Sequence, residues 1–477
     1  MTIYQNLIAG EWIGSDATKN INPSDTNEVV GLYADGSAED TKNAIAAAKS
    51  AFPAWSRSGI WERHVILKKA GDEIMARKDE LGALLAREEG KTLPEAIGET
   101  IRASQIFEFF AGEALRLAGE TIPSVRPNIG VEITRDPLGV IGIITPWNFP
   151  IAIPAWKIAP ALCYGNTIVF KPAELVPACS WAIVDILHRA GLPKGVLNLV
   201  MGKGSVVGQA MLDSPDVAGI TFTGSTGTGK RVAAASLEHN RKFQLEMGGK
   251  NPMVVLDDAD LNVAVEAAAN SGFFSTGQRC TASSRLIVTE GIHDKFVAAL
   301  TAKLETLVVD NAMKSGTHIG PVVDEKQLKT DTDYIEIGKK EGAKLAFGGE
   351  LLKRDTPGFY LQPTLFTEAT NQMRISREEI FGPVVSVIRV KDYEEALATA
   401  NDTPFGLSSG IATTSLKHAT HFKRNAEAGM VMVNLPTAGV DFHVPFGGRK
   451  GSSYGPREQG KYAAEFYTSV KTSYTLA

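Results

Sequence analysis

The chain has 477 residues, of which 44% are hydrophobic and 22% are charged, and its formal net charge is −5. This length exceeds what a single hydrophobic core normally serves, so it predicts two or three domains. The apolar content is typical of a soluble globular protein, and the small negative charge argues against a nucleic-acid partner.

The three cysteines, Cys163, Cys179 and Cys280, are too few and too scattered for a disulfide framework, which favours a reducing compartment. Residues 1–6 lack the basic start and apolar core of a signal peptide. The most apolar region, residues 138–170, is interrupted by prolines and does not predict a membrane span. We therefore expect a cytoplasmic protein with no membrane partner.

The first part of the chain predicts helices followed by a parallel sheet. Residues 39–118 carry apolar residues at three- and four-residue spacing, as amphipathic helices do, and residues 119–137 predict an exposed hairpin. Short apolar runs then alternate with helical stretches, at residues 139–144, 167–170, 196–200 and 219–222. Such alternation predicts a parallel α/β sheet that binds ligands beyond the carboxyl ends of its strands.

A second α/β series follows. Its predicted strands lie at residues 252–256, 285–288, 383–388 and 430–434, with a helix at residues 294–307. Residues 466–477 predict a terminal strand, which needs a partner sheet.

Two segments carry candidate chemistry. Glu246 stands in a Glu-Met-Gly-Gly-Lys motif, and Cys280 ends a Gly-Gln-Arg-Cys motif. A thiolate can attack a carbonyl carbon, and a carboxylate can activate water to release the acyl product. Asn148, after the first sheet strand, can donate a hydrogen bond to a developing oxyanion, although an Asn in this setting is also a common turn residue.

Residues 222–230 form a glycine-rich turn between a strand and a helix, which suits an anion. Arg231 stands where a P-loop requires Ser or Thr, so that motif is excluded, and a simple tight turn remains the alternative. Lys171 and Glu174 follow the strand at residues 167–170. There a carboxylate can accept hydrogen bonds from both ribose hydroxyls of a nucleotide, although a solvated Lys/Glu pair is the commoner arrangement.

Seven motifs in order make the chain resemble the aldehyde dehydrogenase superfamily over nearly its whole length. They begin at Pro146 (PWNFP), Lys171 (KPAE), Phe222 (FTGST), Glu246 (EMGGK), Gly277 (GQRC), Glu379 (EIFGP) and Pro445 (PFGG).

The resemblance implies a role for each residue. Cys280 is the nucleophile, Asn148 and the Cys280 backbone N–H hold the oxyanion, and Glu246 activates water; Lys171 is also placed in the catalytic group. Residues implied to bind the cofactor are Trp147, Lys171, Glu174, Gly224, Ser225, Glu379 and Phe381. Residues implied to line the substrate tunnel are Phe149, Trp156, Arg279 and Phe446. No metal is expected.

Longer stretches resemble the bacterial α-ketoglutaric semialdehyde (2,5-dioxopentanoate) dehydrogenases. Succinate-semialdehyde dehydrogenases typically carry two arginines that bind the substrate carboxylate. This chain has Trp156 and Phe274 at those positions, which argues against carboxylate binding by that pair of arginines. Arg279 and Arg285 are the remaining nearby cations, and a structural role for Arg279 is an equal alternative. Glu174 would repel a 2′-phosphate, so NAD is expected, with NADP as the alternative.

The expected fold is α/β and aldehyde dehydrogenase-like. A Rossmann-type NAD(P)-binding domain would comprise residues 1–118 and 138–249, and a catalytic domain residues 250–450. Residues 119–137 and 451–477 would form a small β oligomerisation element in a homodimer or homotetramer. The competing functions are oxidation of succinic semialdehyde or an aliphatic aldehyde, a CoA-acylating reaction, which the presence of Glu246 disfavours, and a catalytically inactive nucleotide-binding protein.

Overall fold

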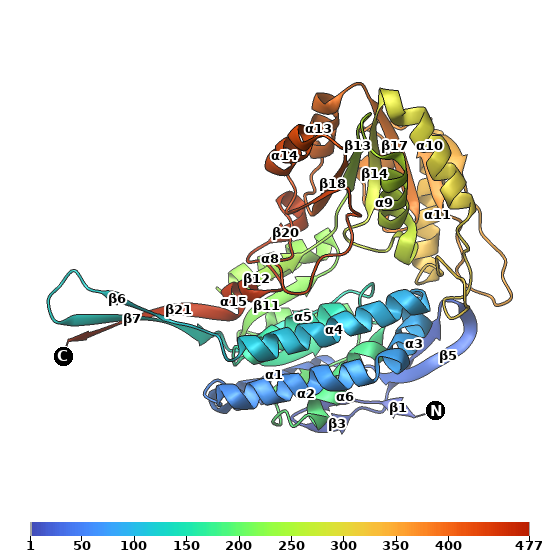
Figure 1. The fold of residues 1–477 in the computed structure, drawn as a ribbon. Coiled ribbons are helices and arrows are strands. Elements are labelled where there is room, and N and C mark those ends of the chain that lie inside the picture. The colour runs from blue at the N-terminus through green and yellow to red at the C-terminus, as the bar shows by residue number, and fades with distance from the viewer. Residues whose placement is uncertain (1, 477) are drawn as a thin grey trace.

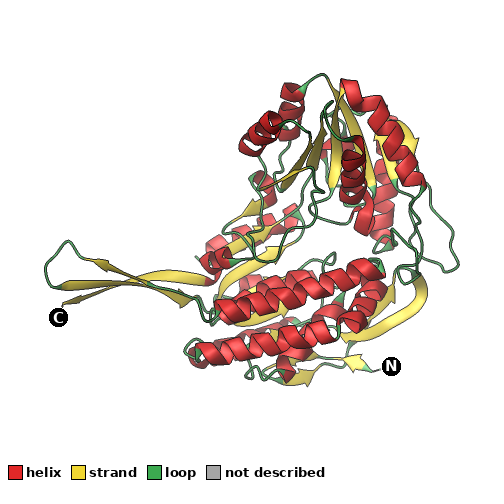
Figure 2. Ribbon diagram, viewed as in Figure 1, coloured by secondary structure: helices red, strands yellow, loops and turns green. Residues whose placement is uncertain are grey.

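The computed structural model describes residues 2–476, which form two α/β units and a projecting β arm (Figures 1 and 2). The α/β class is confirmed. No helix among the described residues is long and apolar enough to cross a membrane.

The first unit is built on an eight-stranded sheet. Its strands, in spatial order, are β20 (Ser453–Tyr454), β12 (Lys242–Glu246), β11 (Val217–Thr223), β8 (Val140–Ile144), β9 (Thr167–Lys171), β10 (Leu197–Leu199), β2 (Asn6–Ile8) and β3 (Glu11–Ile13). The five strands from β12 to β10 run parallel, and β20, β2 and β3 add antiparallel edges. The strands expected at residues 139–144, 167–170, 196–200 and 219–222 are therefore confirmed.

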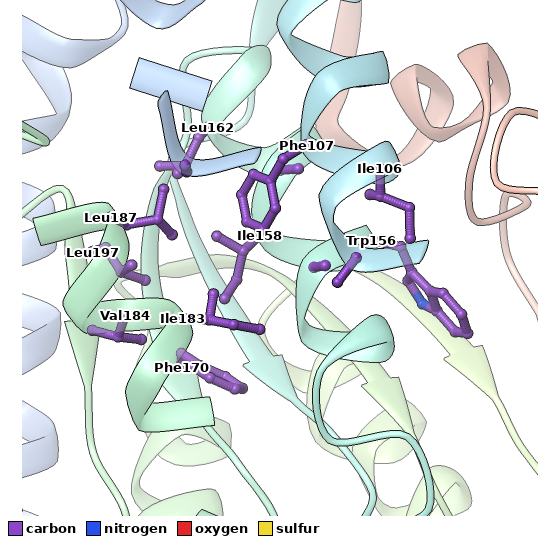
Figure 3. Packing of buried hydrophobic residues seen from close by; sticks show 14 of the residues in the cluster. Ile106, Phe107, Trp156, Ile158, Leu162, Phe170, Ile183, Val184, Leu187 and Leu197 are labelled. Atoms are coloured by element: carbon purple, nitrogen blue, oxygen red, sulfur yellow. The ribbon is translucent and has the colours of Figure 1, made fainter. Parts of the chain in front are cut away.

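Helices cover this sheet. They are α1 (Ala38–Trp55), α2 (Ile60–Ala76), α3 (Lys78–Glu89), α4 (Leu93–Glu113), α5 (Ala152–Cys163), α6 (Pro177–Arg189), α7 (Gln209–Asp213) and α8 (Thr226–Glu238), with a π-helical turn at Gly204–Gly208. Every residue of α5 is buried. Figure 3 shows Phe107 of α4 packed near Ile158 of α5, with Ile183 and Leu187 of α6 beside them.

The second unit is built on a seven-stranded sheet. Its order is β15 (Lys344–Phe347), β16 (Thr364–Thr367), β17 (Val384–Val390), β14 (Ser283–Thr289), β13 (Asn251–Val255), β18 (Ser408–Ala412) and β19 (Met430–Val433). Its helices are α9 (Leu261–Phe273), α10 (Glu290–Glu305), α11 (Glu325–Lys340), α12 (Arg374–Arg377), α13 (Tyr393–Asn401) and α14 (Leu416–Asn425). All strands but β15 run parallel. In Figure 1, α4 runs along the side of the first unit that faces this second unit.

Two small sheets complete the fold. One joins β1 (Ile3–Tyr4), β5 (Asp25–Ala34) and β4 (Ala17–Asn22), and the other joins β21 (Thr468–Leu476), β7 (Ile129–Pro137) and β6 (Glu120–Pro123). The second sheet projects from the molecule as an arm (Figure 1). β21 pairs with β7 of its own chain over nine residues. The terminal strand therefore needs no second subunit to supply its partner.

The structure also departs from the expected boundaries. β20 lies in residues 451–477, which the sequence assigned to the β element, yet it extends the first sheet by pairing with β12. β12 itself was not predicted, although its Lys-Phe-Gln-Leu-Glu sequence alternates polar and apolar residues as a half-buried strand does. The polar Gln244 is nevertheless fully buried, where it bonds to Thr221 and to the carbonyl of Pro456.

Candidate active site

The loop before Cys280 is held in an uncommon backbone conformation. Ser275, Thr276 and Gly277 have φ values of 50°, 57° and 66°, in the left-handed region that L side chains rarely adopt. Glu95 secures the loop, because its Oε1 accepts bonds of 3.0 Å from both the backbone N–H and the hydroxyl of Ser275. Such strain persists only where the surroundings impose it, and here it presents Cys280 to the interior of the molecule.

Cys280 lies where two cavities meet. One cavity, of about 320 Å³, is lined by residues that include Phe149, Trp156, Arg279 and Phe446. Because the sequence analysis expects these four residues to line the substrate tunnel, we call it the substrate-side cavity. The other, of about 280 Å³, is lined by residues that include Trp147, Asn148, Gly224, Ser225, Glu379 and Phe381. Cys280 lines both, so its thiol can meet one ligand from each side.

The surroundings of Cys280 hold its thiol in the neutral form. Burial, followed by the charges of Glu246 and Glu379, raises the pKa of Cys280 to about 12. The backbone N–H groups of Cys280 and Thr281 act in the opposite direction. A neutral thiol is a weak nucleophile, so reaction requires a base or a change in local charge. Cys163 and Cys179 are buried, as expected, and lie away from both cavities.

The Asn148 carboxamide is fixed beside the nucleophile loop. Its Nδ2 donates a 3.0 Å hydrogen bond to the carbonyl of Gln278, two residues before Cys280. The backbone carbonyl of Asn148 accepts a 2.8 Å bond from the Lys91 ammonium, which forms a buried 2.6 Å ion pair with Glu99. A carboxamide carries two N–H donors, so one remains for a ligand oxygen in the cavity that Asn148 and Cys280 share.

Glu246 ends β12 within a buried polar network. Ser453 donates a hydrogen bond to its Oε2, and its Oε1 lies against Gly447, where a Cβ would meet it at 2.8 Å. Burial, and then the charge of Glu458, raises the pKa of Glu246 well above its usual value. Glu458 in turn forms a buried ion pair with Lys157. Glu246 lines neither cavity in this conformation, although it is close enough to raise the pKa of Cys280.

The second cavity offers groups suited to a nucleotide. Ser225 is the N-cap of α8, so the first N–H groups of that helix face this region. The Thr223 hydroxyl, also in the lining, is buried and has no partner within residues 2–476. The Trp147 and Phe381 rings meet edge to face at 5.3 Å. Glu379 accepts a 2.9 Å bond from the Gly249 N–H.

Lys171 is the last residue of β9 and Glu174 follows three residues later, but neither residue lines either cavity. The Glu174 carboxylate is half exposed, accepts a hydrogen bond from the Gly204 N–H and lies 4.0 Å from the Lys171 ammonium. The Lys171 ammonium donates to the Pro172 carbonyl, and burial lowers its pKa to about 8. Both roles expected for Lys171, in catalysis and in cofactor binding, therefore remain predictions.

The substrate-side cavity has an aromatic wall. The Trp156 and Phe446 rings stack at 5.5 Å, and the Lys91 ammonium lies 3.7 Å from the centre of the Phe149 ring. Arg279 also lines this cavity, but its guanidinium is paired with Glu95 at 2.9 Å. Its charge is therefore already matched inside the protein.

Arg285, which the sequence suggested as a nearby cation, and Tyr454 both lie outside the two cavities. Arg285 is buried and donates to the carbonyls of Lys250, Thr399 and Ala400, so it is a structural arginine. Tyr454 stacks on Phe243 at 5.0 Å and lines neither cavity.

Sequence reasoning missed four charged residues of the site, one of which is Glu95. Lys91, Glu99 and Arg102 all line the substrate-side cavity. Glu99 also accepts bonds of 3.0 Å from the N–H groups of Ile151 and Ala152 at the start of α5. The three-residue step from Glu99 to Arg102, which puts both on one face of α4, was the available signal.

The comparisons with known proteins agree with this architecture. The family model described as "Aldehyde dehydrogenase family" matches residues 12–473. The chain is 46% identical to the alpha-ketoglutaric semialdehyde dehydrogenase of Bacillus subtilis, over 98% of this chain and 97% of that protein. It is 42% identical to the 2,5-dioxopentanoate dehydrogenase of Saccharolobus solfataricus, over 99% of each.

A solved structure of another protein has a very similar fold. The betaine aldehyde dehydrogenase of Staphylococcus aureus, in complex with NAD+, superposes with a TM-score of 0.97 at 35% identity, covering 99% of this chain and 95% of that chain. With a family model that spans almost the whole sequence and relatives above 40% identity, the chain belongs to the aldehyde dehydrogenase family.

Proposed function

We propose that this protein oxidises α-ketoglutaric semialdehyde to 2-oxoglutarate with NAD. The observation that carries the proposal is the position of Cys280 at the junction of a substrate-side and a nucleotide-side cavity, with Asn148 beside it. The choice of aldehyde is supported by the names of the Bacillus and Saccharolobus relatives.

The first chemical step falls to Cys280 and Asn148. The Cys280 thiol releases its proton to solvent, its Sγ bonds to the aldehyde carbon, and the carbonyl oxygen becomes an oxyanion. The free N–H of the Asn148 carboxamide and the backbone N–H of Cys280 are the donors that stabilise it. One such donor in a comparable site is worth about 3 to 4 kcal/mol. After oxidation, the acyl group remains on Cys280 as a thioester.

Hydrolysis of that thioester falls to Glu246. Its carboxylate takes a proton from the water that attacks the acyl carbon, which frees the acid and restores Cys280. Glu246 must turn from its hydrogen bond with Ser453 to do so. Glu246 can then release the proton taken from water toward the neighbouring buried ion pair of Glu458 and Lys157.

The residues of the second cavity fit a dinucleotide. The start of α8 with Ser225 and the unpartnered Thr223 hydroxyl suit its phosphates, and Gly224 permits close approach. We assign Glu379 to one ribose and Trp147 with Phe381 to the nicotinamide. Lys171 and Glu174, which lie outside this cavity, are assigned to the other ribose. When bound, NAD supplies the hydride acceptor. Glu174 would repel a 2′-phosphate, which favours NAD over NADP.

The proposal is tested by the initial rate of NADH formation with α-ketoglutaric semialdehyde, succinic semialdehyde and pentanal, without CoA. We expect the keto-acid aldehyde to have the highest kcat/KM and Cys280→Ala to be inactive with all three. A preference for succinic semialdehyde or pentanal would reject the substrate assignment. A requirement for CoA would reject hydrolysis, and inactivity with both NAD and NADP would favour a nucleotide-binding protein.

We further propose a cytoplasmic homodimer or homotetramer, in which the arm of β6, β7 and β21 contacts another subunit. Exposed apolar side chains on this arm support the contact, namely Ile122, Val125, Val470, Tyr474 and Leu476. The domain division expected from the sequence is kept as part of this proposal, with β20 moved to the first unit. Light scattering of the full chain and of a Val125→Glu/Tyr474→Glu variant tests the contact, and unchanged mass would contradict it.

A further inference from the structure

One arginine in the substrate-side cavity has no matching carboxylate. Glu95, Gly98, Glu99 and Arg102 of α4 all line this cavity, and their spacing of three, four and seven residues puts them on one face of the helix. Arg102 therefore projects toward the same space as Cys280.

The hydrogen-bond partners of Arg102 leave part of its guanidinium free. Its Nη2 donates a 3.1 Å bond to the side-chain oxygen of Gln459, and its guanidinium carbon lies 5.8 Å from the Trp156 ring centre. Within residues 2–476, no carboxylate oxygen comes within 4.0 Å of this guanidinium, whereas Arg279 in the same cavity is paired with Glu95. The carboxylates that act on Arg102 from farther away are Glu99, which Lys91 already neutralises, and the exposed Asp441.

The donors around Arg102 lack acceptors. Its own Nε is buried without a partner among the described residues, and the same holds for Nε1 of Trp156 and Nε2 of Gln459. Buried N–H groups are costly unless they meet an acceptor. Arg102 and Trp156 both line the cavity, so this part of its wall suits a ligand group that only accepts hydrogen bonds. A carboxylate is such a group, and the arginine fork matches it in a two-bond geometry.

We propose that Arg102 is a specificity-determining residue that binds the carboxylate of an acidic aldehyde whose aldehyde carbon lies at Cys280. Gln459 and Trp156 are positioning residues that hold the guanidinium in place. This inference rests on the proposed function and deepens it, because it assigns the recognition of the acidic end to one side chain on α4. It also explains how an acidic substrate is held by a wall that has Trp156 instead of a second arginine.

The test compares Arg102→Met and Arg102→Lys with the wild-type enzyme, on α-ketoglutaric semialdehyde and on pentanal, a neutral aldehyde with the same number of carbons. A hydrogen-bonded charge pair of this kind corresponds to a change of about 10- to 150-fold. We expect Arg102→Met to lose that factor in kcat/KM for the acidic aldehyde and to keep its kcat/KM for pentanal. Arg102→Lys should recover part of the loss, since it keeps the charge but not the fork.

Product inhibition gives a second readout that does not depend on the chemical step. The inhibition constant of 2-oxoglutarate should rise by a similar factor in Arg102→Met, with pentanal as the varied substrate. Arg116→Met is the matched control, because it removes an exposed arginine just beyond the end of α4 whose only ion pair among the described residues is with Glu113. Thermal melting checks that each variant is folded. If Arg102→Met does not fold, Arg102→Lys, the more conservative change, still tests the role of Arg102.

The two hypotheses fail in different ways. If the wild-type enzyme itself prefers pentanal to the acidic aldehyde, the proposed function is wrong. If the wild type prefers the acidic aldehyde but Arg102→Met loses nothing, or loses equally on both aldehydes and leaves product inhibition unchanged, the role of Arg102 is wrong and the proposed function stands.

Discussion

The side-chain amide of Asn148 donates a hydrogen bond to the carbonyl of Gln278, and this bond ties the end of the first sheet to the nucleophile loop of the second unit. Cys280 follows Gln278 by two residues, so the bond fixes a candidate oxyanion donor relative to the nucleophile. Lys91 holds the same segment from the other side, through the Asn148 carbonyl. The site is therefore assembled by contacts between segments that are far apart in sequence.

Asn148→Ala removes a side-chain donor to the oxyanion. We expect kcat to fall by about 100- to 1000-fold, because that is the effect of losing one such donor in comparable sites. KM for the aldehyde should change much less, because the bond strengthens only as the oxygen becomes charged. Steady-state kinetics on a variant whose melting temperature matches wild type checks this. A kcat within a factor of three of wild type would remove Asn148 from the mechanism.

Lys91→Met leaves the Glu99 carboxylate buried without its ion-pair partner. Breaking one side of a buried pair typically costs about 3–5 kcal/mol, so we expect a loss of that order in the free energy of unfolding. Urea denaturation measures it. In Lys91→Met/Glu99→Gln the unpaired charge is gone, so the double variant should be more stable than Lys91→Met alone. If both variants are as stable as wild type, the Lys91–Glu99 ion pair does not contribute to the stability of the fold.

Glu246→Gln should stop the reaction after oxidation, because Gln cannot accept a proton from water. Mixing the variant with aldehyde and NAD should produce a burst of about one NADH per active site and almost no steady-state rate. In stopped-flow experiments wild type should show continuous turnover. A variant that turns over continuously without a burst would show that another group activates the water.

The pH dependence of hydrolysis follows from the raised pKa of Glu246. The carboxylate accepts a proton only when ionised, and burial beside Glu458 raises the pKa at which it ionises. The steady-state rate of a reaction limited by hydrolysis should therefore fall as pH is lowered through that raised pKa, well above the range of an ordinary glutamate. A rate that stays constant down to about pH 4.5, the ordinary value, would contradict the raised pKa.

Glu89 gives a separate prediction for stability. Burial raises its pKa to about 8, and its Oε1 has no partner among the described residues. The folded protein binds the proton of the Glu89 carboxyl more tightly than the unfolded chain does. The contribution of protonated Glu89 to the free energy of unfolding is therefore full below about pH 4.5 and is lost as pH rises toward 8. Glu89→Gln should therefore melt at a higher temperature than wild type at pH 8, with a smaller difference near pH 5. An equal difference at both pH values would contradict this sign.

The sequence predicted the α/β class, the principal strands and the two segments that carry Cys280 and Glu246. These features depend on local patterns, namely short apolar runs and contiguous motifs. The sequence did not identify Lys91, Glu99 and Arg102, because charged residues on an amphipathic helix usually face solvent. Only the packing of α4 between the two units turns this polar face inward. β12 was also missed. Its polar Gln244 is buried because it forms hydrogen bonds with residues that are distant in sequence.

The most direct test of the mechanism is intact-mass and peptide mass spectrometry of Glu246→Gln after one turnover with α-ketoglutaric semialdehyde and NAD. The thioester mechanism predicts an acyl group on the peptide that contains Cys280, in an amount equal to the NADH formed, and none on Cys163 or Cys179. NADH formation without any acyl group on Cys280, confirmed under acid quench, would contradict the thioester mechanism and the central role of Cys280.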